Sequence, residues 1–505
     1  MTRNFLFVAS LMGLSAVGCA QIGSEARVGE AIDLVEQHTG QRPAWTVPWD
    51  DQPPAWDGQA VLGLEEAVAT ALRNNRDLRA DLEMIGQADA DLVQAGLLAN
   101  PSFNFMIMFP SGGGRSMLRS SALPMMPLQD LWLIPARQEV ATAQLQQAVL
   151  RVADRAVETA AAVKKAYARL QYTQRASELI QDNMQVVDQS VRLIQAGQAA
   201  GRATQVAANL AQIRYLKLRS ELLAMEAERR RLQRELLMLM GVAAATDRWR
   251  VKPLQELNDP VETPIGESEL VALARNQRLD LKAAEWSAQA AEHRIGLLRR
   301  EGWPEVGLGL TFERAPAPRS QNQRLVGRAG NAAAQGVAGA IMGMPPTGPM
   351  VAPFNPKMRE VKYTIGPMIE MEIPIFDWNQ AQVAKALHEY GQRLAESEAR
   401  AQEITRMVRE TLVMCQQAYD QVRFYRETIM PAVERNVTLA QQSYIAGQED
   451  LTIYLQTQED LIMTRLKVLD FFRDYHVNRA ELERQVGGRL IGAEPTTRPT
   501  TGPAA

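Results

Sequence analysis

The chain has 505 residues, of which 46% are hydrophobic, and its formal net charge is −3 at pH 7. This balance excludes the strongly basic surface that nucleic acids or anionic membranes attract. Beyond the N-terminus no run of about 20 apolar residues occurs, so we expect no transmembrane helix in the mature chain.

The chain begins with the pattern of a bacterial targeting segment. A basic residue precedes a short apolar run, and small residues lead directly into Cys19. A signal peptide over 1–18 that ends in AVGC is similar to a bacterial lipoprotein signal, so Cys19 is expected to carry lipid. An ordinary cleaved signal with an incidental cysteine is the alternative. Because Ala20 and not an aspartate follows Cys19, the signal indicates the outer membrane, and residues 19–61 are expected to form a lipid-anchored extended arm.

The rest of the chain contains an internal sequence repeat. The segment ALRNNRDLRA at 71–80 is similar to LARNQRLDLKA at 273–283. Four glycines keep the same spacing, because 40 residues separate the first two and 40 separate the last two: Gly201, Gly241, Gly447 and Gly487. We therefore predict an internal duplication, with repeat 1 over 62–265 and repeat 2 over 266–488. Each repeat is expected to form a helix, two strands, a long helix and a return helix.

Two very long helices are expected, one in each repeat. The first is predicted from about Ala136 to Ala196 and the second from about Asn379 to Ala446, each without interruption. Apolar residues recur at spacings of three and four, as in Leu145, Val149, Val152, Ala156 and Val163. Such spacing is typical of helices that pack as in a coiled coil.

Four segments alternate with a period of two, which indicates β-strands with one apolar face. The segment 101–110 carries mostly phenylalanine on that face, and the weakest segment, Leu118–Met126, is expected to place Leu123 and Met125 there. Two more strands follow in the second repeat, and their expected apolar residues are Val306, Leu308, Leu310 and Phe312, then Tyr363, Ile365, Ile369, Met371 and Ile373.

Strands of about ten residues with one apolar and one polar face are typical of transmembrane β-barrels. Glu313, Glu370 and Glu372 fall on the polar faces and are expected to face a water-filled interior. Four strands are too few to close a barrel, and open strand edges cannot stand in lipid. Several chains would therefore have to contribute strands to one barrel.

From about Leu62 to Gly488 the chain resembles the TolC-like outer membrane efflux proteins. The segments that carry the resemblance are LGLEEAVATALRNNRDLRA, GPMIEMEIPIFDWNQAQVAKA and SYIAGQEDLTIYLQTQEDLIMTRLKVLDFFRDY. The resemblance implies a mainly α-helical homotrimer in which a twelve-stranded outer-membrane barrel, four strands per chain, continues as a helical periplasmic tunnel. It also implies a periplasmic adaptor and an inner-membrane pump of the RND or ABC type as partners.

By this resemblance the protein is a passive exit duct of a tripartite efflux system, exporting drugs or metal ions. A type I protein secretion channel and a periplasmic coiled-coil structural protein are the alternatives. We find no nucleophile–base arrangement and no histidine pair at metal-ligand spacing, so no enzyme, cofactor or metal site is expected. No nucleic acid partner is expected either.

The entrance of the tunnel is expected at the turns around Gly201 and Gly447. Family members carry an aspartate ring one turn after the second glycine, but this chain has Ile453 and Gln456 at the matching positions. The charged residues lie on the turns themselves: Arg202, Glu449 and Asp450. In the resting state of the channel, either Arg202 forms an ion pair with one of these acids, or all three are solvated charges that contribute little to stability.

The remaining segments have low periodicity. The long loop 315–360 is rich in glycine, alanine and proline and holds four methionines, which are either soft-metal ligands or chance members of a flexible loop. Residues 489–505 are expected to form a disordered tail.

Overall fold

The computed structural model describes most of the helical and strand-forming sequence. The described residues are 23–46, 56, 61–108, 119–201, 204–242, 249–253, 265–317, 360–449 and 451–490. The predicted signal peptide, Cys19, most of the long loop and the C-terminal tail lie outside these ranges. None of the helices within them is both long enough and apolar enough to cross a membrane.

The chain divides into two compact units, which we describe separately. The helical unit comprises 1–94, 140–292 and 388–505, and the sheet unit comprises 95–139 and 293–387. Each unit takes residues from both predicted repeats.

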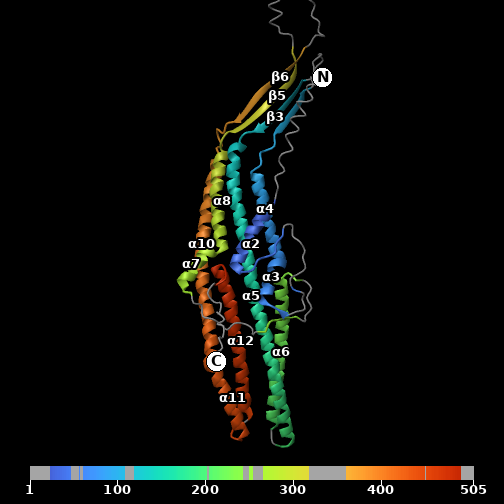
Figure 1. The fold of residues 1–505 in the computed structure, drawn as a ribbon, viewed down its shortest axis with the longest axis vertical. Helices are drawn as coiled ribbons and strands as arrows, with labels where there is room; N and C mark the ends of the chain where they lie inside the picture. Colours follow the sequence, from blue (N-terminus) through green and yellow to red (C-terminus); the bar gives the residue numbers. More distant parts are fainter. Residues whose placement is uncertain are drawn as a thin grey trace, which may run out of the picture. The chain divides into compact units, whose positions relative to one another are not determined.

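The helices of the first half are α2 (Glu25–Thr39), α3 (Leu64–Asn74), α4 (Arg76–Ala95), α5 (Asp130–Ala199) and α6 (Gln205–Leu239). Helix α2 lies within 19–61, so the expectation of an extended arm is wrong over Glu25–Thr39. Those of the second half are α7 (Glu267–Gln277), α8 (Leu279–Glu301), α10 (Gln380–Phe424), α11 (Met430–Ile445) and α12 (Leu451–Val486). In Figure 1, α5 and α6 form one hairpin and α11 and α12 form another. The chain reverses at Gly201 and Gly447, whose φ angles of 72° and 71° suit glycine.

The first long helix is predicted correctly and extends further than expected. Helix α5 has 70 residues, and at 1.5 Å per residue it is about 105 Å long. Pro135 lies in its second turn, close enough to the N-terminus that few hydrogen bonds are lost.

The second long helix is not continuous, so the expectation of one unbroken helix over 379–446 is wrong. A π-helical turn over Tyr425–Ile429 separates α10 from α11, and Pro431 follows it in the first turn of α11. Proline has no N–H to donate, and its ring would collide with the carbonyl four residues earlier, that of Glu427. The wider π turn removes this collision.

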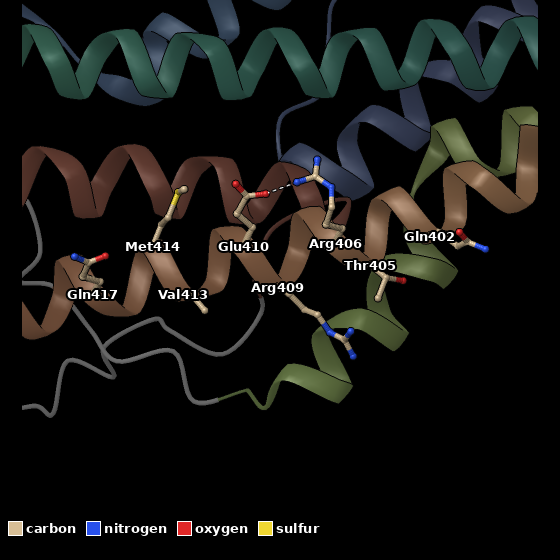
Figure 2. Close-up of a pocket in the computed structure, with 8 residues that line it drawn as sticks. All are labelled: Gln402, Thr405, Arg406, Arg409, Glu410, Val413, Met414 and Gln417. Carbon is tan, nitrogen blue, oxygen red and sulfur yellow. Dashed lines mark hydrogen bonds and ion pairs between the residues drawn. The ribbon is translucent and has the colours of Figure 1, made fainter.

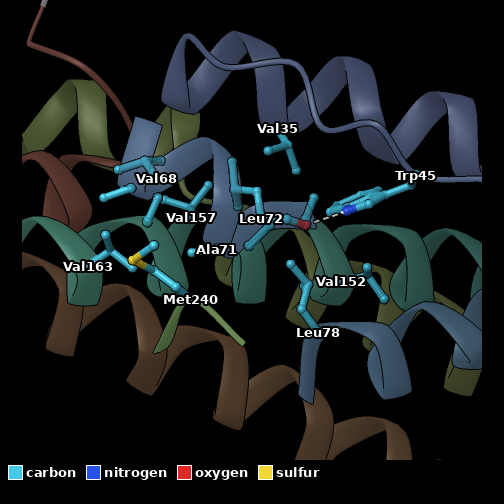
Figure 3. Close-up of a cluster of buried hydrophobic side chains, with 14 of the residues drawn as sticks. Val35, Trp45, Val68, Ala71, Leu72, Leu78, Val152, Val157, Val163 and Met240 are labelled. Carbon is cyan, nitrogen blue, oxygen red and sulfur yellow. Dashed lines mark hydrogen bonds between the residues drawn. The ribbon is translucent and has the colours of Figure 1, made fainter. Parts of the chain in front are cut away.

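Apolar side chains from several segments form the core of the helical unit. Figure 3 shows Val35, Leu72, Leu78 and Val152 converging on this core together with the indole of Trp45. The Trp45 indole N–H donates to the Leu72 carbonyl at 2.7 Å, so its one polar group is satisfied while buried. Truncating a fully buried leucine such as Leu72 to alanine is expected to cost about 2–5 kcal/mol.

The two halves end with matching contacts. Gly241, with φ 66°, follows α6 and lies so close to the turn between α3 and α4 that an added Cβ would overlap the Asn74 carbonyl. Gly487, with φ 92°, follows α12, and an added Cβ would lie 3.1 Å from the backbone nitrogen of Arg278, between α7 and α8. Two side-chain hydrogen bonds repeat this relation: Asn75 to the Leu239 carbonyl at 2.9 Å, and Arg278 to the Gln485 carbonyl at 3.4 Å.

A two-stranded parallel ladder belongs to the helical unit. It pairs β1 (Val61–Leu62) with β4 (Arg250–Val251). The hydroxyl of Tyr167 on α5 donates to the Leu62 carbonyl at 2.9 Å and accepts from the Lys252 amide at 3.2 Å. Tyr167 therefore attaches the segments before α3 and after α6 to the long helix.

The sheet unit contains four antiparallel strands in the order β2-β3-β5-β6. They are β2 (Ser102–Met108), β3 (Arg119–Pro127), β5 (Glu305–Ala317) and β6 (Glu360–Glu372). All four strands are where the alternation predicts them. Among the described residues, the outer edges of β2 and β6 pair with no further strand.

Candidate functional site

The strand register gathers apolar side chains on one face of the sheet. One row across the strands is Phe105, Ala122, Phe312 and Ile365, and the next is Phe103, Pro124, Leu310 and Pro367. In the single chain this face is open to solvent, with Phe103 67% and Ile369 71% exposed. An apolar surface this continuous indicates contact with lipid or with another protein.

The prediction for β3 is wrong in one respect. Leu123 and Met125 lie on the polar face, because Leu123 pairs with Asn104 and Met125 pairs with Gly309. The segment Ala122–Met126 carries apolar residues on both faces, so its own pattern does not select a register. The pairing with β2 and β5 decides it instead.

The polar face carries the three predicted glutamates. Glu313 forms an ion pair with Arg119 at 2.8 Å. Glu370 and Glu372 form no ion pair within the described ranges, and Glu372 pairs in register with Glu305. Like charges directly opposite each other destabilise a sheet. This placement is therefore favourable only where water surrounds the carboxylates.

Aromatic residues lie where the strands of the sheet unit meet helical segments. The rings of Trp132 and Trp303 are 6.2 Å apart, and the Trp378 indole donates to the Ile375 carbonyl at 3.2 Å. Phe376 is 91% exposed. A hollow of about 630 Å³ adjoins Trp132, Trp303 and Phe376. Exposed tryptophans beside an apolar sheet face are typical of a membrane–water interface.

The hairpin turns in the helical unit are open at their glycines. An added Cβ at Gly201 or Gly447 would meet no atom within 4 Å. Arg202 and Asp450 lie outside the described residues, so their proposed pairing stays a prediction. Glu449 is among the described residues and lies on the second turn.

Ile453 and Gln456 both lie in the first two turns of α12. Ile453 is 44% exposed, and Gln456 lines a hollow of about 510 Å³ between α6 and α12. Arg214 on α6 pairs with Glu459 on α12 across the same hollow. This places Gln456 beside a contact that joins the two hairpins.

An aromatic contact at this end of the helices was not predicted from the sequence. Tyr444 on α11 and Tyr454 on α12 stack with ring centres 5.9 Å apart and an interplanar angle of 5°. The Gln458 amide also donates to the Tyr454 hydroxyl at 2.5 Å. Two tyrosines on either side of a turn glycine were the available signal, because a hairpin brings such positions together.

A buried ionic cluster connects helices of the helical unit. Asp280 accepts hydrogen bonds from Arg278 at 2.8 Å and from Arg400 at 2.6 Å. Burial alone would raise the pKa of Asp280, but the two guanidinium groups outweigh it and hold this pKa below its usual value. Burial and the charge of Asp280 raise the pKa of neighbouring Asp154 to about 6. A hollow of about 190 Å³ adjoins both carboxylates.

A larger hollow, of about 630 Å³, runs along one face of α10 (Figure 2). All eight residues that line it come from this single helix, and Arg406 pairs there with Glu410 at 2.6 Å. A surface built from one helix encloses nothing, so we assign it no binding role.

Comparison with known proteins explains this combination of sheet and long hairpins. Residues 270–488 match the family described as outer membrane efflux protein. A search of the curated proteins finds no match.

Solved structures extend the likeness to most of the chain. The structure of CusC, which forms a transmembrane channel, has a TM-score of 0.65 at 17% identity, and the match covers 89% of this chain and 98% of CusC. The outer membrane protein VceC of Vibrio cholerae has a TM-score of 0.62 at 16% identity, covering 84% and 96%. The MtrE outer membrane channel of Neisseria gonorrhoeae has a TM-score of 0.62 at 17% identity, covering 90% and 98%. The chain therefore has the fold of these outer membrane proteins.

The part that matches the efflux family contains most of the predicted site residues. Strands β5 and β6, the three glutamates and the whole α11–α12 hairpin fall within 270–488. Strands β2 and β3 and the α5–α6 hairpin lie before residue 270. They are compared with known proteins through the solved structures and not through the family model.

Proposed function

We propose that this protein is a passive outer-membrane exit duct of a tripartite efflux system. Three chains would contribute four strands each to a twelve-stranded barrel, and their helices would continue the barrel as a tunnel in the periplasm. A periplasmic adaptor and an inner-membrane pump would be its partners. The duct would carry out no chemistry of its own, because the pump would supply the energy and the direction.

The two-faced sheet is the observation that carries this proposal. Its apolar face is exposed in all four strands, its polar face holds unpaired carboxylates, and both of its edges are open among the described residues. Lipid on one side, water on the other and neighbouring copies at the edges would satisfy all three features. A periplasmic coiled-coil spacer would require none of them.

The internal duplication belongs to the same proposal. The repeated element order supports it, and so do the matching contacts of Gly241 and Gly487. Two similar halves per chain would give a trimer six similar helical segments around one tunnel. The lipid anchor at Cys19 would add a second attachment to the outer membrane.

Mass and conductance measurements on the full chain in mild detergent test the proposal. Light scattering is expected to give three times the mass of the mature chain, and planar bilayers are expected to show discrete conductance steps. A monodisperse monomer without conductance would refute the duct and favour the structural coiled-coil protein. Conductance combined with export of a co-expressed protein substrate would favour the type I secretion channel instead.

A further inference from the structure

The polar face of the sheet contains methionines that its proposed function does not explain. The four strands hold six methionines: Met106, Met108, Met125, Met126, Met368 and Met371. Met126 and Met371 lie on the apolar face, where a thioether is an ordinary lipid-facing group. The other four lie on the polar face among serine, threonine and glutamate.

Two of these methionines lie on either side of one glycine. Gly309 on β5 pairs with Met125 on β3 and with Met368 on β6. Neighbouring strands are about 4.8 Å apart, so the two methionine backbones are about 10 Å apart with no side chain between them. An unbranched methionine side chain is flexible and spans about half of that distance, so the two thioethers can reach a common point over the glycines of β5.

The next row across the sheet adds a carboxylate. The Met125 sulfur leans over Gly307 and lies 2.9 Å from the position that a Cβ of residue 307 would occupy. The Cβ of Glu370, which pairs with Gly307, lies 3.8 Å from the same position. A thioether and a carboxylate side chain therefore flank one glycine, and Met368 is two residues from Glu370 on the same face.

Both glycines let neighbouring groups lie close to the backbone of β5, and Gly309 is buried beneath them. A side chain at Gly309 would come within 2.8 Å of the Pro124 carbonyl, and one at Gly307 would displace the Met125 sulfur. Without side chains at these two positions, the thioether of Met125 can lie directly against the strand.

Thioether sulfur is a soft ligand that selects Cu(I) over hard cations such as Mg²⁺ or Ca²⁺. We propose that Met125 and Met368, with Glu370 as the nearby negative charge, bind a monovalent soft cation, Cu(I) or Ag(I), on the polar face of the sheet. Binding itself depends only on the sheet. Passage of such an ion through the protein rests on the proposed duct.

Methionine oxidation mapped by mass spectrometry tests the site in the unmodified full chain. The detergent-solubilised protein is treated with hydrogen peroxide in chloride-free buffer, with and without Ag(I), and sulfoxide formation is followed at each methionine. Ag(I) is expected to slow oxidation of Met125 and Met368 and to leave Met106 and Met108 unchanged. Equal protection of all four, or of none, would overturn the proposal.

Isothermal titration with silver nitrate supplies the matched comparison. The double variant Met125→Leu/Met368→Leu is expected to bind Ag(I) at least about tenfold more weakly than the parent. Met126→Leu/Met371→Leu makes the same changes on the same strands but on the opposite face, and it is expected to bind as the parent does. The buried Cys415 is present in both variants and cancels from the comparison.

The two proposals fail separately. A conducting trimer in which Ag(I) protects no methionine would refute the metal site and leave the duct intact. A non-conducting monomer in which Met125 and Met368 are still protected would refute the duct and leave the binding site intact. Equal loss of Ag(I) affinity in both double variants would also refute the site.

Discussion

Replacing Asp154 by asparagine is expected to stabilise the protein at neutral pH. Burial among α5 and its neighbours is the main reason that the pKa of this carboxyl is raised to about 6. Asp280 and Glu158 raise it further, and Arg278 and Arg484 lower it only in part. Asparagine keeps the size of the side chain and removes the charge that the folded protein disfavours.

The magnitude follows from linkage between protonation and folding. The pKa is 3.8 for the free carboxyl and about 6 in the folded chain, and each unit corresponds to about 1.4 kcal/mol. Between these two values the folded state binds more protons than the unfolded state, so the unfolding free energy decreases as pH rises. The ionised Asp154 therefore costs up to about 3 kcal/mol above pH 6, and this cost disappears as pH falls towards 4.

Thermal unfolding in detergent, followed by circular dichroism at several pH values, measures this effect. Asp154→Asn is expected to raise the Tm by roughly 2–4 °C at pH 8 and by progressively less towards pH 4. Asp182→Asn is the control, because Asp182 lies exposed on the same helix. A variant that is less stable than the parent at pH 8, or stabilised equally at pH 8 and pH 4, would refute the reasoning.

Three further predictions concern other parts of the chain. Leu308→Arg on the apolar face of the sheet is expected to cost about 2–4 kcal/mol near the membrane midplane, and Thr311→Arg on the polar face less; equal losses of heat-resistant oligomer on gels would contradict the assigned faces. Gly201→Ala is expected to cost about 1 kcal/mol for its positive φ alone, whereas Gly241→Ala also collides with the backbone and should lower the Tm much more; similar Tm values would show that the collision is relieved. Burial lowers the pKa of His476 to about 4, so this group destabilises the folded protein as pH falls from 6.5 to 4, opposite in sign to Asp154. The Tm of His476→Phe relative to the parent should therefore rise as pH falls through this range; a Tm difference that does not change with pH would exclude this role of His476.

The sheet shows which features the sequence could predict. In β5, glycine, threonine and glutamate alternate with Val306, Leu308, Leu310 and Phe312, so the pattern itself specifies the faces. In β3 both faces are apolar from Ala122 to Met126, and only pairing with other strands selects the register. The register of β3 therefore cannot be predicted from the residues of β3 alone.

Long-range contacts account for most of the remaining differences. Burial is the main cause of the raised pKa of Asp154, and the next is the charge of Asp280, which belongs to the other half of the chain. Pro431 was visible in the sequence as a helix-breaking residue, but whether the chain would bend, stop or widen there depended on the packing of α11 against α12. The stacking of Tyr444 on Tyr454 likewise follows from how tightly the hairpin closes.

The π-helical turn before Pro431 has a consequence for the design of labelling experiments. A single wide turn adds one residue to the winding, so every later side chain is rotated by about 100° from the direction that an unbroken helix would give it. Positions chosen for cross-links or fluorophores on α11 by counting heptads forward from α10 would therefore point to a different neighbour. The count has to restart at Met430, and Leu439 and Ile445 provide exposed reference points beyond it.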